Sequence, residues 1–405
     1  MSQNRSIAIG TQYIIVLLLV IFSGSIIPFI FTQKYTVFLI SFLLYLIFII
    51  LISLTVKVNY LSFLYVLSMT SFLIFLLCIH NDFDRITEYS GFVGRFLIAF
   101  IVTALISKDT FVKAYTNIIV YYSIISLIMY AIGFAFPSFI LSLPISFNDA
   151  GTGYRQILFY FYQGIDLWNF RNAGIFWEAG AYQVFLSIAL IFEVFLIKGS
   201  VFRILVLFVA IATTISSIGI VVLTIISFVL LFSIKSIFRY PLFILLALCI
   251  WLSGVFDALV LVKFYGNNIS GIDRLSGQLA DLQLFLRNPL FGVGVNEYNE
   301  AFKEVAYSLG AVQPTSSNSF TGMLALNGLL YSAVFFLPML GFFFNIPIKF
   351  KEKVTMLLIF VLLLCSQGVM MQILFLCLSF YSFHHYTDSF SPIDFSRSKV
   401  RGSFA

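Results

Sequence analysis

The sequence is dominated by apolar runs of about twenty residues, which restrict the chain to folds that have lipid as their solvent. The hydrocarbon core of a bilayer is about 30 Å thick and needs about 20 apolar residues per helix. Only 10% of the residues are charged, and the mean hydropathy of +1.05 lies well above that of a soluble globular chain. We therefore expect an integral membrane protein.

The apolar runs favour helices over a closed barrel. An unpaired backbone group in hydrocarbon costs several kcal/mol, so a spanning segment must be a helix or part of a barrel. Barrel strands alternate apolar and polar residues, whereas the run 37–56 shows no such alternation. We predict an all-α fold, a polytopic transmembrane helical bundle that forms a single integral membrane domain over residues 1–405.

Two apolar stretches are expected to cross the membrane twice. The stretch 201–232 has positive charge before and after it, which implies an even number of crossings, and a polar cluster around Thr213 lies in its middle. The stretch after Lys353 has the same pattern, with its interruption at Gln367 and its neighbours. About twelve spans result, the others lying near 12–32, 35–56, 60–80, 91–107, 115–136, 174–197, 241–262 and 317–345.

The distribution of basic residues predicts the orientation. With the N-terminus in the cytoplasm, most of the 23 Lys and Arg residues fall in cytoplasmic loops or tails, as the positive-inside rule requires. This topology explains the net charge of +6 without a nucleic-acid partner. It also places two long loops, about 137–173 and 263–316, on the external side and leaves a short disordered cytoplasmic tail at about 386–405.

Several arginines lie in the two long loops on the predicted external side, where the positive-inside rule disfavours them. A guanidinium group stays charged and presents a planar fork that matches phosphate oxygens, so external arginines are suited to binding an anion. Alternatively, these side chains extend to lipid headgroups or pair with carboxylates of the loops. Our candidates for contact with a pyrophosphate-linked lipid are Arg155, Arg171, Arg274 and Arg287.

The segment after Arg171 contains a candidate acid or base. Glu178 stands at the predicted outer end of a span, directly after Trp177. A carboxylate beside an aromatic ring near the membrane surface can act as a general base or acid. Alternatively, Trp177 belongs to an aromatic belt and Glu178 is a helix N-terminal charge favoured by the dipole. Tyr182, one turn further on, is a candidate substrate contact.

The second long loop is expected to contain a short amphipathic helix from about 273 to 287, ended by Asn288 and Pro289. Such a helix can lie on the membrane surface. Asp281 on this helix is a candidate substrate-binding residue. Asn318 opens the next span and is either a helix cap or a substrate contact.

Other chemistries have less support in the sequence. There is no Walker loop, no serine nucleophile elbow and no histidine-rich set, so we expect neither a metal nor another cofactor. Asp82 and Asp84 fit a solvated turn better than a metal site. Ionisable residues near or within spans are typical of ion paths, which keeps a transporter open as an alternative; these residues are Arg95, Glu193 and Asp257.

Three sequence blocks follow one another along the chain. They are the segment 171–183, the segment 281–294 with its Asn-Pro-Leu and two glycines, and the Asn-Ser-Phe sequence that begins at Asn318. Together they resemble the O-antigen polymerase (Wzy) and O-antigen ligase-like superfamily of membrane glycosyltransferases. The resemblance extends over nearly the whole chain, and it implies a GT-C-like bundle of about twelve spans in the bacterial inner membrane.

This resemblance also implies a reaction. The enzyme would join undecaprenyl-pyrophosphate-linked oligosaccharide repeat units at the periplasmic face, with membrane lipid and a chain-length-determining co-polymerase as partners. Arg171 and Arg274 would stabilise the pyrophosphate leaving group without a metal, and Glu178 would take the proton of the acceptor hydroxyl.

One departure separates the alternatives within the superfamily. Its ligases resemble one another in having a histidine directly before the asparagine that opens the late span, and Ser317 occupies this position here. We therefore favour a polymerase over a ligase that transfers finished polymer to lipid A core. From a different class, a polysaccharide flippase or transporter without chemistry remains the alternative.

Overall fold

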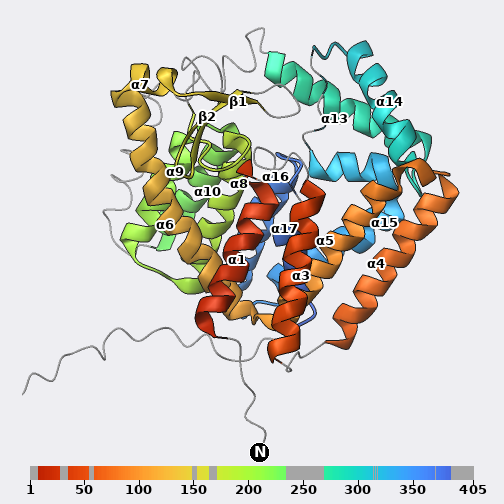
Figure 1. Cartoon of the computed structure of the whole chain (residues 1–405), viewed down its shortest axis with the longest axis horizontal. Helices are drawn as coiled ribbons and strands as arrows, with labels where there is room; N and C mark the ends of the chain where they lie inside the picture. Colours follow the sequence, from red (N-terminus) through yellow and green to blue (C-terminus); the bar gives the residue numbers. More distant parts are fainter. Residues whose placement is uncertain are drawn as a thin grey trace, which may run out of the picture.

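The structure is a computed structural model in which the described residues are mostly helical, with one small sheet (Figure 1). The predicted span 241–262, the predicted tail 386–405 and Ser317 lie outside these residues. The described residues are 8–27, 35–53, 59–147, 153–163, 171–233, 269–312, 314, 316, 318–369 and 371–384.

Five helical segments are long and apolar enough to cross a membrane, among the residues that the structure describes. These apolar helices agree with the all-α membrane protein that the apolar runs predict. The five segments are α4 (Tyr60–Ile79), α5 (Ile86–Leu105) with the short helix η1 (Phe83–Arg85) before it, α6 (Lys108–Ala135), α8 (Ala179–Ile191) with the π-helix η3 (Phe192–Ile197) after it, and α15 (Ser319–Phe344).

Shorter apolar helices complete the bundle, and two of its breaks coincide with the predicted interruptions. The chain leaves the helical conformation after Thr213 and again after Leu364, where polar residues interrupt the apolar runs. The shorter helices are α1 (Ile9–Gly24), α3 (Tyr35–Ser53), α9 (Val201–Thr213), α10 (Ser217–Ser233), α16 (Phe350–Leu364) and α17 (Ile373–Tyr381).

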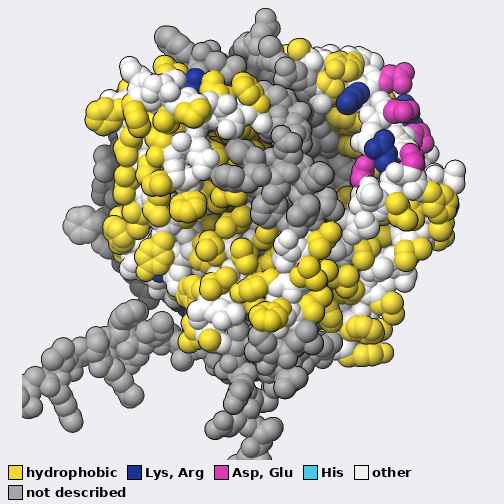
Figure 2. Space-filling view, viewed as in Figure 1, with side chains coloured by type: hydrophobic (Ala, Val, Ile, Leu, Met, Phe, Trp, Pro, Cys, Tyr) yellow, Lys and Arg dark blue, Asp and Glu magenta, His cyan; other side chains and the backbone are white. Residues whose placement is uncertain are grey.

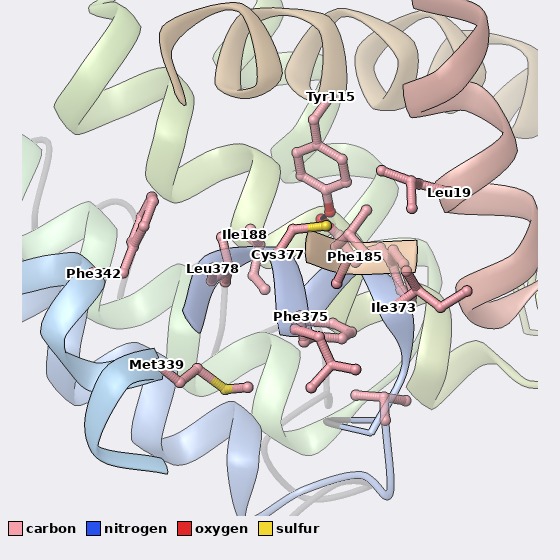
Figure 3. Packing of buried hydrophobic residues seen from close by; sticks show 14 of the residues in the cluster. Leu19, Tyr115, Phe185, Ile188, Met339, Phe342, Ile373, Phe375, Cys377 and Leu378 are labelled. Atoms are coloured by element: carbon pink, nitrogen blue, oxygen red, sulfur yellow. Dashed lines mark hydrogen bonds between the residues drawn. The ribbon is translucent and has the colours of Figure 1, made fainter. Parts of the chain in front are cut away.

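Helix α8 is the centre of the bundle, because all of its residues are buried. It contacts α6, α9, α10 and α16, and its side chains join one large apolar core. Figure 3 shows Tyr115 of α6 pointing toward Phe185 of α8, and the Tyr115 hydroxyl donates a hydrogen bond of 2.8 Å to the Phe185 carbonyl. The middle of α8 is therefore held in a fixed position within the bundle.

The first long segment, which the sequence predicts as an external loop in an all-α fold, contains regular structure that includes three strands. It contains α7 (Pro137–Ser142) and an antiparallel sheet of order β1-β2-β3, formed by Ile145–Phe147, Gly153–Ile157 and Tyr160–Gln163. The registers pair Ile145 with Arg155 and Arg155 with Tyr162. The sheet is tied to the segment after Arg171, because the Phe161 amide donates to the Gly174 carbonyl at 2.9 Å.

The second long segment contains the predicted helix and a further one. Helix α13 (Ile269–Arg287) ends where the Asn-Pro pair follows, as predicted, and α14 (Gly294–Ser308) comes after it. Figure 1 shows α7 and β1 at the same end of the molecule as α13 and α14. In Figure 2, charged side chains gather over α13 and α14, whereas hydrophobic side chains cover the flanks.

Helix α15 is interrupted in its middle by the segment that joins α13 to α14. The Leu329 amide donates to the Pro289 carbonyl at 2.8 Å, and the Ala325 carbonyl accepts from the Val293 amide at 2.9 Å. In an uninterrupted helix these two groups would bond to each other. Gly328 has φ +75° at the break and Gly292 has φ +72°, a region that favours glycine. The backbone of α15 therefore fixes α13 and α14 to the bundle.

A buried carboxylate fixes the start of α14. Asp82, in the turn between α4 and α5, accepts hydrogen bonds from the Val295 amide at 2.7 Å and the Tyr89 hydroxyl at 2.8 Å. A carboxylate at a helix N-terminus satisfies free amides and interacts well with the helix dipole. Asp82 is therefore not the solvated turn residue that the sequence suggests.

Candidate functional site

Arg171 lies half-buried in the segment between the sheet and α8. Its Nε donates to the Thr214 carbonyl at 2.8 Å, in the turn between α9 and α10. Within the described part of the chain, its two terminal nitrogens make no hydrogen bond. The guanidinium group is therefore fixed through Nε, and its two terminal nitrogens can donate to a ligand.

The charge of Arg171 is coupled to both other predicted catalytic residues. Burial lowers the pKa of Arg171, the Glu178 carboxylate raises this pKa, and the Arg274 guanidinium lowers it. These effects indicate that Glu178 and Arg274 lie in the electrostatic neighbourhood of Arg171, although Arg274 comes from a segment about a hundred residues later in the chain.

Hydrogen bonds of Asn172 and Tyr182 fix the chain next to Arg171. The Asn172 amide donates to the Thr213 carbonyl at 3.0 Å, and its side chain donates to the Thr213 hydroxyl at 3.0 Å. The Tyr182 hydroxyl bonds to the Ser126 hydroxyl at 2.8 Å, and the Tyr182 ring is fully buried. In this conformation the Tyr182 hydroxyl therefore bonds within the protein, whereas the sequence suggested a substrate contact.

The other two predicted arginines take different positions. Arg287 is exposed and lies thirteen residues after Arg274 on α13, which is about 20 Å along the helix axis. This separation along the axis is several times the length of a diphosphate, so Arg287 does not lie beside Arg274. Arg155 is buried within the central strand β2. The structure therefore brings Arg171 and Arg274 together, but it does not bring Arg287 to the same place.

Asp281 is the centre of a buried hydroxyl cluster that joins α13, α14 and α15. Its carboxylate accepts hydrogen bonds from Tyr298 at 2.7 Å, Thr321 at 2.9 Å and Ser316 at 3.1 Å. Burial raises the pKa of Asp281 to about 6, although these three hydrogen bonds lower it. Asp281 is fully buried, so it holds the α13 helix in place and does not face a substrate in this conformation.

The raised pKa of Asp281 predicts a pH-dependent stability. Because the folded-state pKa of about 6 exceeds the ordinary value of 3.8, the folded protein binds this proton more tightly than the unfolded chain does. The resulting stabilisation is complete below about pH 4 and is lost as the pH rises through about 6, amounting to about 3 kcal/mol at most. We expect the melting temperature of the wild-type protein to fall relative to that of Asp281→Asn between pH 4 and 7.

The matched control for this experiment is Glu304→Gln, because Glu304 is an exposed acid on α14. Its melting temperature should follow that of the wild-type protein at every pH. Parallel curves for the wild-type protein and Asp281→Asn would show that the Asp281 proton does not contribute to stability.

Asn318 is the N-cap of α15. Its side-chain oxygen accepts hydrogen bonds from the Phe320 amide at 2.9 Å and the Thr321 amide at 3.2 Å. Of the two roles that the sequence left open, the structure shows the helix cap. The cap also places the Thr321 hydroxyl against Asp281, so Asn318 contributes to the same hydroxyl cluster.

Comparisons with known proteins do not assign the chain to a family. No family model, no curated protein and no solved structure matches it. Any function must therefore be inferred from the chemistry of the site.

Glu193, one of the ionisable residues that suggested an ion path, forms a buried ion pair. Glu193 of η3 is fully buried and forms a two-point ion pair with Arg203 of α9, at 2.6 Å to Nε and 2.9 Å to Nη2. A buried carboxylate needs such a pair to offset its desolvation. Among the described residues, no three His, Cys, Asp or Glu side chains are grouped to hold a metal ion.

Proposed function

We propose that the chain is a surface-polysaccharide polymerase that joins undecaprenyl-pyrophosphate-linked oligosaccharide repeat units. The observation that carries this proposal is that Arg274 lowers the pKa of Arg171, which indicates that two cationic side chains from separate segments lie near each other. Two like charges at one place repel each other unless an anion lies between them. A diphosphate attached to a membrane lipid fits this site, because the site lies at one end of a bundle of apolar helices.

The site residues suit a glycosyl transfer. The acceptor hydroxyl oxygen forms a bond to the anomeric carbon of the donor glycan, and the bond from that carbon to the pyrophosphate oxygen breaks. The electron pair of the broken bond goes to the pyrophosphate, where Arg171 and Arg274 stabilise the developing charge. Glu178 takes the proton of the acceptor hydroxyl, and its coupling to Arg171 supports its place beside the leaving group.

The proposal includes a location and partners. The chain crosses the bacterial inner membrane about twelve times in a GT-C-like bundle, with both termini in the cytoplasm and the site at the periplasmic face. This topology is supported by the apolar helices and by the gathering of α7, β1, α13 and α14 at one end. The partners are the lipid-linked glycan, the surrounding lipid and a co-polymerase that sets chain length in lipopolysaccharide biosynthesis.

A deletion in the native strain tests this function against its alternatives. Loss of a polymerase leaves surface lipid that carries single repeat units but no ladder, as seen by gel separation of the surface glycans. Complementation with the wild-type chain should restore the ladder. Loss of a ligase would also remove the single units, and loss of a flippase would accumulate lipid-linked units that face the cytoplasm; either result would contradict the proposal.

A further inference from the structure

The break between α16 and α17 lies against the first turn of α8. A Cβ atom added to Gly180 would meet the Nε2 atom of Gln367, and it would lie 3.5 Å from Oε1 of Glu178. These two atoms are therefore neighbours above Gly180, although Gln367 comes from the break after α16 and Glu178 from the start of α8. The place of Gln367 beside Glu178 depends on the missing side chain at position 180.

The Gln367 amide reaches the surface, although the residue as a whole is nearly buried. It is 5% exposed, and its amide makes no hydrogen bond with any residue that the structure describes. Its backbone is held in place, because the Ser319 hydroxyl at the start of α15 donates to the Gln367 carbonyl. A held backbone that carries a free amide at the surface is suited to binding a polar ligand.

We infer that Gln367 binds the acceptor sugar and holds its attacking hydroxyl against Glu178, an inference that rests on the proposed function. A side-chain amide carries a donor and an acceptor without charge, which matches neutral sugar hydroxyls and not a phosphate. The phosphate is already matched by Arg171, whose charge is coupled to that of Glu178. An acceptor between Glu178 and Gln367 therefore lies next to the leaving group.

Gln367 transfers no proton in this step. The acceptor proton goes to Glu178, the new bond joins the acceptor oxygen to the donor anomeric carbon, and the bond to the pyrophosphate breaks. Gln367 forms hydrogen bonds to the acceptor both before and during the reaction. Uniform binding of this kind lowers KM for the acceptor and leaves kcat nearly unchanged.

Two variants remove the contact in different ways. Gln367→Leu keeps the approximate size of the side chain and removes the amide. Gly180→Ala leaves the amide in the sequence but pushes it away, and this is tolerable because the group it meets is the end of a flexible side chain. Alanine is also the better helix former in the first turn of α8, so Gly180→Ala is expected to fold.

The test uses the purified full chain in lipid nanodiscs, with lipid-linked repeat units extracted from the deletion strain. Donor polymer is held fixed, the labelled single unit is varied, and initial elongation rates are measured. We expect both variants to raise KM for the acceptor about tenfold, the contribution of one hydrogen bond to a substrate, with kcat and donor KM changed less than about threefold.

Two matched controls accompany the variants. Gly91→Ala places its methyl group in open space on α5, and Gln283→Leu removes an exposed amide from α13. Both should retain the wild-type acceptor KM, and melting temperature identifies any variant that fails to fold. An unchanged acceptor KM in a folded Gln367→Leu or Gly180→Ala protein would overturn the inference while the polymerase proposal stands. Failure of the wild-type protein to elongate any glycan would overturn both.

Discussion

Replacement of Arg171 or Arg274 by alanine is expected to lower the rate of glycan elongation by about 100-fold or more. In the proposed reaction each guanidinium group stabilises the negative charge that develops on the leaving pyrophosphate, and loss of one such donor typically costs about 100-fold to 1,000-fold in kcat. Elongation by the purified variants, followed by gel separation of the products, measures this loss. In cells, the same variants should show single repeat units without a ladder.

The double variant gives a sharper test of the shared site. If both arginines act on one diphosphate, Arg171→Ala with Arg274→Ala should be little slower than either single variant, because groups that act as a unit are not additive. Lys303→Ala is the matched control, since Lys303 is an exposed cation on α14 of the same segment. Full elongation by either arginine variant would remove that residue from the mechanism.

Replacement of Gly292 or Gly328 by alanine is expected to destabilise the protein by at least about 3 kcal/mol. Both glycines have positive φ, where a side chain adds strain, and a Cβ atom on either would meet the backbone of the opposite segment. At Gly292 this is the Leu326 carbonyl, and at Gly328 it is the backbone of Leu290. Thermal unfolding in detergent, followed by intrinsic fluorescence, should show a clearly lower midpoint for each variant.

Gly341→Ala is the control for this pair. Gly341 lies on the same helix as Gly328, but a Cβ atom there would make only an ordinary contact of 3.5 Å with Ser382. Its unfolding midpoint should stay close to that of the wild-type protein. A wild-type midpoint for both Gly292→Ala and Gly328→Ala would show that the joining segment is not inserted into α15.

Apolar runs and polar interruptions are local signals, so the sequence predicts the helices and their breaks at Thr213 and Leu364. The strands β1–β3 are only three to five residues long, and their stability depends on partners that no local pattern reveals. Helix α14 has its N-terminal carboxylate from Asp82, which lies more than two hundred residues earlier in the chain. No sequence window contains both groups.

The candidate site, too, can be predicted only in part from local sequence patterns. Arginines on the predicted external side can be identified from the sequence by type and position, and this selects Arg155, Arg171, Arg274 and Arg287 without showing which of them lie near each other. The separation of Arg287 from Arg274 follows from helix geometry once α13 is placed. Gln367 is visible in the sequence only as a helix break, because its position beside Glu178 depends on how α16, α17 and α8 pack.

The central claim is that one lipid-linked diphosphate binds between Arg171 and Arg274. A cryo-electron-microscopy structure of the protein with an undecaprenyl-pyrophosphate-linked repeat unit tests it most directly. We expect density for the diphosphate within about 3 Å of both guanidinium groups, which is the length of a charge-assisted hydrogen bond. A diphosphate bound elsewhere on the molecule, or in contact with neither arginine, would contradict the claim.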